Sequence, residues 1–557
     1  MAEALPSQLV VQTTAEALRE KRKLRRNFRR FDMLFYLICT VVTLDTIGAV
    51  ASNGAQGFTW LLFLAVFFFL PYALSIAELG SAFPQEGGPY VWTRLAFGRP
   101  LAAVNAVIYW VSNPIWVGGS LTIVSLAALG VFFTPISGAW QYVYALAFIW
   151  FTVGTAIVSL QYGKWVPTLG AWARGAVLVF FEVSVFLYAA RHGVHGLGGH
   201  AFMPTYAVFI AVVPVLFFNF AGMEVPSAAG EEMTNPRRDV PFSIAWSGLA
   251  TVLAYGLPVL SIVLVLPATQ VTGLTGFLDA AKAVFTVYGG HVTGGTATLT
   301  GTGLLLGRIT ALVFVFALAS AGATWIMGAD RTEAVACFDG GGPSALGRFS
   351  SRFGTPVAMN LLSGTVATVL MVLAFKITGG NANRYFAAVL GLTISTTTIS
   401  YLFIFPALIK LRRSRPEVER PYRVPWGTAG AWLCSVVPTF WALLATVALI
   451  WPGFGVGWFG TSGNPNDDLA LLSFSHQRLA YELSQIVPLA VIIIVGVIFY
   501  ALGRRTRQDV ATEPVTAAYG PADPAPCRPP RRSASAGSFS SATFCRQARP
   551  SSPATRR

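Results

Sequence analysis

Two carboxylates lie inside stretches of this sequence that are otherwise apolar enough to cross a membrane. Glu224 follows the apolar run 207–218, with Gly222 before it and Pro226 after it, and Asp45 interrupts a second apolar run. A carboxylate inside a hydrocarbon-length helix costs at least a few kcal/mol, so such a residue commonly lines a cavity or pathway. Gly and Pro beside it favour a helix that opens within the membrane, where freed backbone groups face protein or water. These positions predict a transport pathway.

The sequence allows two interpretations of each carboxylate. Glu224 is expected either to take up and release a proton during a transport cycle or to hydrogen-bond permanently within an unwound turn. Asp45 is expected either to bind a cation or cationic substrate or to cap exposed N–H groups. We predict that Glu224 and Asp45 are the residues of proton or ion coupling.

The elements that must position these carboxylates are long apolar helices. The 557 residues are 54% hydrophobic and 11% charged, with mean hydropathy +0.60, which excludes a soluble domain of this length. Because a spanning helix needs about 20 apolar residues, we predict an all-α polytopic membrane protein with twelve transmembrane helices. They are expected near 33–57, 59–82, 101–132, 139–160, 166–190, 207–230, 241–268, 303–330, 355–375, 385–409, 426–450 and 479–503.

The net charge of +15 is distributed unevenly along the chain. With the amino terminus placed in the cytoplasm, most of the 39 Lys and Arg residues fall in cytoplasmic segments. This positive-inside pattern predicts a multi-pass protein of the cell (plasma) membrane with both termini cytoplasmic, and it argues against nucleic acid as a partner. The five cysteines have no paired spacing, so we expect neither a disulfide framework nor a metal site, and no cofactor.

Composition divides the chain into five parts. Residues 1–32 are expected to form a basic cytoplasmic arm that either meets anionic lipid head groups or serves only to set the topology. The first five spans occupy 33–190, the next five occupy 207–411, and the last two occupy 426–503. The tail, 504–557, is rich in Pro, Ser, Ala and Arg, and it is expected to be disordered in the cytoplasm.

The first ten spans form two sets of five. An odd number of spans gives the two sets opposite orientations, and each set opens with an interrupted span, at 43–49 and at 219–224. Paired interruptions at corresponding positions of inverted halves point to a substrate site near the membrane midplane.

Four motifs carry a resemblance to a known family. They are FPQEGGPY with FG within 83–98, FFNFAGME with EEMTNPRRDVP within 217–241, GTPV at 354–357 and RPYRVP at 420–425. With these motifs the chain resembles the amino acid–polyamine–organocation (APC) superfamily over about residues 30–500. The resemblance implies the LeuT-type fold, a 5+5 inverted repeat with discontinuous helices 1 and 6. Two shorter stretches, 323–328 and 378–381, are similar to the bacterial glutamate/GABA antiporter-like branch.

One departure from the family pattern falls in the first interruption. Members commonly carry a Gly-Ser-Gly type stretch there, whereas 46–54 reads TIGAVASNG. An amino acid would offer its carboxylate to N–H groups at a half-helix amino-terminal end, which is positive, and its ammonium to freed carbonyls of helix 6. The predicted substrate-binding residues are Thr46, Ile47, Gly48, Ala49, Asn113, Phe218, Phe220, Ala221, Gly222, Trp325 and Thr397.

Several of these residues have a purely structural alternative. The interruptions also fit kinks in ordinary packing. Trp325 is a candidate gate, together with Trp110, Trp116 and Phe220, but aromatic residues also pack or anchor at the membrane interface. Thr397 lines the pathway or bonds within its own helix.

Arg174 and Glu182 lie eight residues apart in the fifth span, so they share a helix face. In some members of the superfamily a lysine of this helix takes the place of a sodium ion. An interior salt bridge or snorkelling of Arg174 is the favoured alternative.

We predict a secondary active transporter that moves amino acids by alternating access, with proton coupling or exchange. The alternative is a polyamine or other organic-cation transporter or antiporter of the same fold. A channel would need a filter or charged ring, and an enzyme would need a nucleophile–base constellation; neither pattern is recognisable, so we predict no enzyme. The expected partners are an amino acid or amine substrate, a proton or counter-substrate, and membrane lipids.

Overall fold

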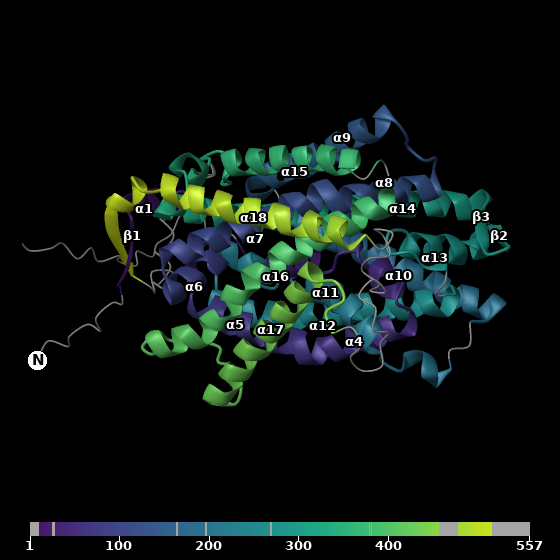
Figure 1. Ribbon diagram of the computed structural model, residues 1–557, viewed down its shortest axis with the longest axis horizontal. Coiled ribbons are helices and arrows are strands. Elements are labelled where there is room, and N and C mark those ends of the chain that lie inside the picture. The colour runs from purple at the N-terminus through teal and green to yellow at the C-terminus, as the bar shows by residue number, and fades with distance from the viewer. Residues whose placement is uncertain are drawn as a thin grey trace, which may run out of the picture. The chain divides into compact units, whose positions relative to one another are not determined.

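Helices make up nearly all of the structure, because a chain in lipid must satisfy its backbone hydrogen bonds internally (Figure 1). The computed structural model describes residues 10–24, 28–162, 165–194, 198–267, 270–377, 379, 381–455 and 477–514. Within them, 11 helices are long and apolar enough to cross a membrane. They are α4–α5 (Gly54–Ala82), α7–α8 (Arg99–Phe132), α9 (Ala139–Tyr162), α10 (Trp165–His192), α11–η4 (Tyr206–Glu232), α12 (Pro236–Val265), α14–η7 (Gly301–Gly341), α15 (Val357–Ile377), α16 (Ala382–Ser414), α17 (Gly427–Ile450) and α18 (Arg478–Leu502).

The two interruptions predicted from the sequence are both present. In place of the first predicted span, α2 (Arg30–Val41) ends, the chain runs extended at Val42, and α3 (Ile47–Ala51) follows. The helix α11 (Tyr206–Phe220) ends at an extended Ala221, and 3₁₀ turns (η4, Val225–Glu232) continue the path. The all-α membrane fold with discontinuous helices is therefore confirmed, while the count of twelve and the inverted repeat stay predictions.

The turn that follows α3 lies earlier in the chain than predicted. The next helix, α4 (Gly54–Leu64), begins five residues before the expected 59, and a π-helical turn (Ala65–Phe69) joins it to α5 (Leu70–Ala82). A Cβ at Gly57 would lie 2.4 Å from the carbonyl oxygen of Val50. Glycine therefore permits this tight return, which the hydropathy pattern alone does not reveal.

Shorter elements cap the two ends of the helices. They are α1 (Ala15–Lys21), α6 (Gly88–Phe97), α13 (Gly276–Val284) and strands β1 (Val10–Thr14), β2 (Gly290–Thr293), β3 (Thr296–Leu299) and β4 (Val510–Pro514). Strands β2 and β3 form an antiparallel hairpin, and β1 pairs antiparallel with β4. The structure thus differs from the disorder predicted over 504–557, because β1 supplies a hydrogen-bonding edge for 510–514; residues 515–557 lie outside the described part.

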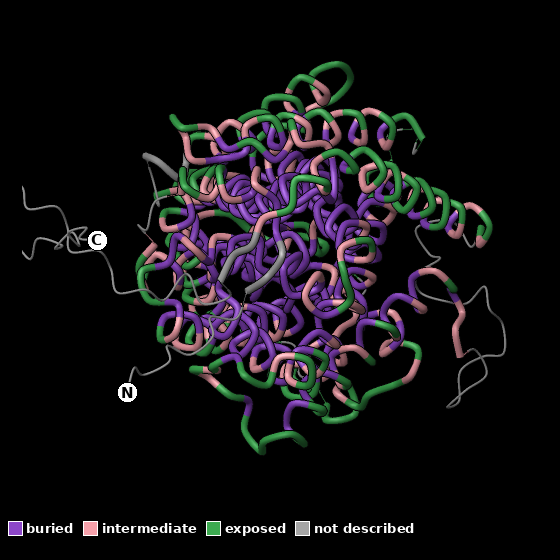
Figure 2. The backbone as a smooth tube through the Cα atoms, turned by 90° about the vertical axis from the view of Figure 1, so that its left-hand side faces the viewer, coloured by how far each residue is buried: buried purple, intermediate pink, exposed green. Residues whose placement is uncertain are grey.

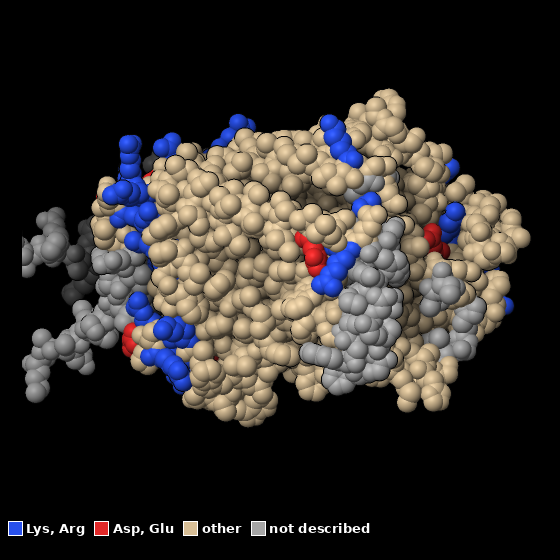
Figure 3. All heavy atoms as spheres, in the orientation of Figure 1, with Lys and Arg blue, Asp and Glu red and all other residues tan. Residues whose placement is uncertain are grey.

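Buried residues lie in the middle of the helix bundle, and exposed residues lie mainly on the helices at its periphery (Figure 2). The spans α7–α8, α11–η4 and α16 are largely buried, whereas most of α18 is exposed or half-buried. Lys and Arg side chains gather at the end where α1 and β1 lie, which we call the basic end (Figures 1 and 3). This clustering agrees with the positive-inside pattern, and the orientation of the termini stays a prediction.

Candidate functional site

Asp45 lies in the break between α2 and α3, and helix α7 with its π-helical extension holds it there. Its Oδ2 accepts hydrogen bonds from Trp116 Nε1 at 2.8 Å and from Ser120 Oγ at 2.6 Å. Its Oδ1 has no hydrogen-bond partner among the described residues, although the side chain is only 2% exposed. Nor does any Lys or Arg of the described chain form an ion pair with it. A buried carboxylate in this setting favours a proton or a cation beside it.

Glu224 lies in the break between α11 and η4, inside a cluster of tyrosines. Tyr72 of α5 donates a hydrogen bond to Oε2, and Tyr109 of α7 donates one to Oε1 at 2.8 Å. The Tyr72 hydroxyl also accepts the N–H groups of Gly222 at 3.0 Å and Met223 at 2.8 Å. One tyrosine therefore satisfies both the carboxylate and two backbone donors that the unwound helix sets free.

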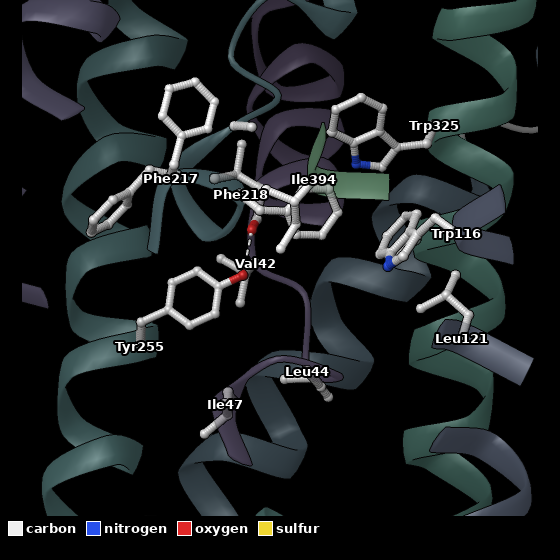
Figure 4. Packing of buried hydrophobic residues seen from close by; sticks show 14 of the residues in the cluster. Val42, Leu44, Ile47, Trp116, Leu121, Phe217, Phe218, Tyr255, Trp325 and Ile394 are labelled. Carbon is white, nitrogen blue, oxygen red and sulfur yellow. Dashed lines mark hydrogen bonds between the residues drawn. The ribbon is translucent and has the colours of Figure 1, made fainter. Parts of the chain in front are cut away.

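Aromatic rings lie between the residues that bind the two carboxylates, and Figure 4 shows Trp116, Trp325 and Phe218 of this group. The Trp116 ring lies 6.2 Å from that of Trp325, and Trp325 lies 6.4 Å from Tyr109, as centroid distances. Phe218 lies 5.8 Å from Trp116. Because Trp116 binds one carboxylate and Tyr109 binds the other, the rings form a path between them. Ring faces attract cations and pack against methylene groups.

Polar side chains near the breaks are left without partners. Thr46 Oγ1 and both polar atoms of Asn113 and Asn219 have no hydrogen bond within the described residues, and each of these side chains is at most 1% exposed. Buried polar groups in folded proteins are nearly always satisfied. These groups are therefore available to a bound substrate, ion or water.

The residues predicted to bind a carboxylate do not gather in one pocket. Ile47 packs in the hydrophobic core, and Gly48 lies against the loop before α13, where a Cβ would come within 2.9 Å of the Gly273 oxygen. Ala49 lines a cavity of about 690 Å³, whose lining also includes residues 271–274 of the loop before α13. Thr46 contributes an unpartnered side-chain hydroxyl among the described residues. Their binding role stays a prediction.

The sixth-helix residues and Trp325 lie beside the second break. Gly222 has φ +113° and packs under Trp325, whose Nε1 donates to the Thr40 carbonyl at 2.9 Å. Ala221 caps α11 with a bond to the Phe218 carbonyl, and Phe220 points away from the aromatic path, stacking on Phe69 at 4.6 Å.

Thr397 does not contribute a bond to either carboxylate. Its hydroxyl donates to the Thr393 carbonyl in its own helix at 2.8 Å. The role of Thr397 as a pathway residue is untested, and the bond within its own helix is the alternative that the sequence allowed.

Sequence reasoning missed the residues that hold the breaks. Tyr255 of α12 donates to the Val41 carbonyl at 2.8 Å and accepts the Thr43 N–H at 2.8 Å, so it ties the end of α2 (Figure 4). Tyr72 likewise ties the second break, through the carboxylate of Glu224 and the N–H groups of Gly222 and Met223. The available signal was the presence of tyrosines within apolar spans, because a buried hydroxyl needs a partner. The presence of a tyrosine does not tell which residue its hydroxyl binds.

Arg174 does not form the expected salt bridge with Glu182. It is 1% exposed and donates to the Ala317 carbonyl of α14 at 2.8 Å and to Ser320 Oγ at 3.3 Å. Glu182 instead accepts a bond from Ser261 at 2.6 Å. A fixed positive charge thus links α10 to α14.

Ion pairs close the basic end. Arg331 of α14 pairs with Glu86, in the loop before α6, and with Glu232, at the end of η4, at 3.1 Å. Lys21 of α1 pairs with Glu231 at 2.6 Å. Burial raises the pKa of the Glu86 carboxyl above its ordinary 4.5, against the opposing effect of Arg331. These contacts join the second half of the broken sixth span to its neighbours.

The broken helices thus hold two buried carboxylates, and a cavity lies beside α3. A model of a family described as amino acid permease matches residues 28–459. The chain belongs to this amino acid permease family. It is therefore a membrane transporter of the APC superfamily.

Two bacterial relatives match most of this chain. An uncharacterized transporter of Legionella pneumophila is 28% identical over 409 residues, which cover 70% of this chain and 83% of the relative. A probable agmatine/putrescine antiporter of Lactococcus lactis is 26% identical over 412 residues, with 72% and 83% covered.

A plant relative and a solved structure extend the comparison. A polyamine transporter of rice (Oryza sativa) is 26% identical over 431 residues, with 74% of this chain and 72% of the relative covered. A crystal structure of a manganese transporter from Eremococcus coleocola aligns with TM-score 0.53 at 13% identity, covering 86% of this chain and 94% of that one. At this identity the likeness shows the fold alone.

Proposed function

We propose that this permease carries organic cations of the diamine and polyamine class by exchange or with proton coupling. The observation that carries the proposal is Asp45, a buried carboxylate with one free oxygen, beside tryptophan rings and without a basic partner in the described chain. An ammonium group supplies the missing positive charge and the missing hydrogen-bond donor at once. The expectation of an amino acid substrate came from the family resemblance.

The two carboxylates suit a substrate that is charged at both ends. A diamine has two ammonium groups separated by methylenes, and the aromatic path from Trp116 to Tyr109 offers ring faces along that length. Asp45 would hold one ammonium, and Glu224 would hold the other or exchange its proton against it. The names of the Lactococcus and rice relatives, an agmatine/putrescine antiporter and a polyamine transporter, support this class.

A second candidate is a zwitterionic amino acid. The unpartnered amides of Asn113 and Asn219 favour it, because an amide N–H can donate to a substrate carboxylate. The family description also favours it. No Lys or Arg of the described chain pairs with Asp45 or Glu224, so a second carboxylate would enter a site that is already acidic.

The cavity and the ion pairs suggest a conformation within an alternating-access cycle. The cavity beside Ala49 is lined by the loop before α13 and by the first turns of α16, while Arg331 and its partners close the basic end. With the basic end in the cytoplasm, this arrangement corresponds to an outward-open state. Substrate would enter past α3 and leave when the ion pairs separate.

Thermal unfolding of the purified protein with candidate ligands tests the substrate class. A ligand that binds the native state at a hundredfold excess over its Kd adds about 2.7 kcal/mol of stability. We expect putrescine or agmatine to raise the Tm of the wild type and of Glu182→Gln, but not of Asp45→Asn. Shifts with neutral amino acids alone would favour the second candidate and contradict the first.

A further inference from the structure

A second pair of buried carboxylates lies on α14, outside the site described above. Asp330 and Glu333 are both fully buried, and their three-residue spacing places them on one face of the helix. Asp330 Oδ2 and Glu333 Oε2 have no hydrogen-bond partner among the described residues. Neither carboxylate forms an ion pair with a described Lys or Arg. The transport path does not explain this pair.

The helices packed around the pair present only neutral groups. Ser363 of α15 donates to Asp330 Oδ1 at 2.7 Å, and Trp110 of α7 donates to Ser363 at 2.7 Å. The titratable group that faces the pair in the described structure is the Cys337 thiol, which donates to Glu333 Oε1 at 3.5 Å. No positive charge therefore compensates the two carboxylates.

Asn360 adds a further acceptor on the facing helix. It lies one turn before Ser363 on the same face of α15, is 1% exposed, and its Oδ1 has no partner in the described chain. Two ionised carboxylates here would each cost several kcal/mol and would repel each other. A proton on the pair removes one charge and supplies a donor for the oxygens that lack one.

We propose that Asp330 and Glu333 form a proton-binding site of this transporter, separate from Glu224. No group of three or more His, Cys, Asp or Glu side chains in the described residues is placed to hold a metal ion, so the proton is the ligand that this geometry fits. The site lies in the helix α14 rather than in the unwound segments.

The turn of α14 that holds the pair also holds Arg331, whose ion pairs close the basic end and act as a gate there. Arg331 follows Asp330 directly, and its guanidinium binds Glu86 and Glu232. When the basic end opens, these carboxylates move away, and the positive charge of Arg331 then lowers the cost of ionising the pair. The O–H bond of one carboxyl breaks, its proton passes to water at the basic end, and the carboxylate that remains is compensated by Arg331. This step rests on the proposed transport cycle.

Infrared spectroscopy of the full-length protein in nanodiscs tests the site without substrate. The wild type should show the C=O stretching band of a protonated carboxylic acid at neutral pH. The double variant Asp330→Asn/Glu333→Gln should lose roughly one carboxyl of this band, because neighbouring buried carboxylates do not both ionise. Glu182→Gln is the control and should not remove that component. An unchanged band in the double variant would overturn the proposal.

A second pair of variants tests the link to the gate. Glu86→Gln/Glu232→Gln removes the partners of Arg331, so the acid band should fall further in the wild-type background than in Asp330→Asn/Glu333→Gln, where only the carboxyls of Glu86 and Glu232 themselves are lost; the amide band confirms folding. An equal fall in the two backgrounds would overturn the link, and a band that falls only when Na⁺ is added would identify a sodium site instead. Because no substrate is present, these results are independent of whether putrescine binds.

Discussion

At the scale of single residues, Gly222 occupies a position that no other amino acid fits. Its φ of +113° is unfavourable for residues with a side chain, and a Cβ would lie 2.9 Å from Trp325 Cζ2 and 2.9 Å from Thr40 Cγ2. We expect Gly222→Ala to cost about 1–3 kcal/mol in backbone strain, with a lower Tm and reduced uptake. Gly154→Ala is the control, because its Cβ meets nothing within 4 Å. Equal Tm values for the two variants would contradict this explanation.

The sequence identified the two carboxylates but not their surroundings. Asp45 and Glu224 were recognisable because a charge in an apolar span is costly. Their hydrogen-bond partners, Trp116 and Tyr72, lie 71 and 152 residues away along the chain. No local pattern specifies such a pair, because the contact depends on how the helices pack.

At the scale of elements, Tyr72 connects α5 to the break in the sixth span. Its hydroxyl bonds Glu224 and the N–H groups of Gly222 and Met223. We expect Tyr72→Phe to lower the free energy of unfolding by about 1–3 kcal/mol for each buried group left unsatisfied. Unfolding in denaturant measures this cost. Tyr385→Phe, which removes a single bond to Gly118, should cost less; an equal cost would contradict the role of Tyr72.

The breaks themselves could be predicted, but their exact ends could not. Gly222 and Pro226 beside Glu224 indicated the second interruption, and the polar residues and Gly48 within 43–49 indicated the first. The early start of α4 depends on the approach of Gly57 to Val50, and the order of 510–514 depends on pairing with β1. Both are contacts between segments, and hydropathy reports only whether each segment prefers lipid or water.

At the scale of the whole molecule, the closed basic end should respond to pH through Glu86. Burial raises the pKa of this carboxyl in the folded state above 4.5, so folding favours its protonated form. Its contribution to stability is present below pH 4.5 and is lost as the pH rises through the folded pKa. We expect the Tm of the wild type to fall with rising pH more steeply than that of Glu86→Gln.

The exposed Glu419, which pairs with Arg237, supplies the comparison. Glu419→Gln should keep the steeper pH dependence of the wild type. Identical slopes for the wild type and Glu86→Gln would show that the carboxyl at the basic end has an ordinary pKa, contrary to the effect of its burial.

Exchange of labelled putrescine in proteoliposomes tests the central claim most directly. Loss of a buried charge partner costs a ligand about 2–5 kcal/mol, so Asp45→Asn should lower the uptake rate at limiting substrate by about 100-fold. Glu182→Gln, a carboxyl variant in another span, should transport at the wild-type rate. Saturable putrescine exchange that depends on Asp45 is the result we predict. Exchange of neutral amino acids by the wild type, without putrescine exchange and with Asp45→Asn still active, would contradict the account.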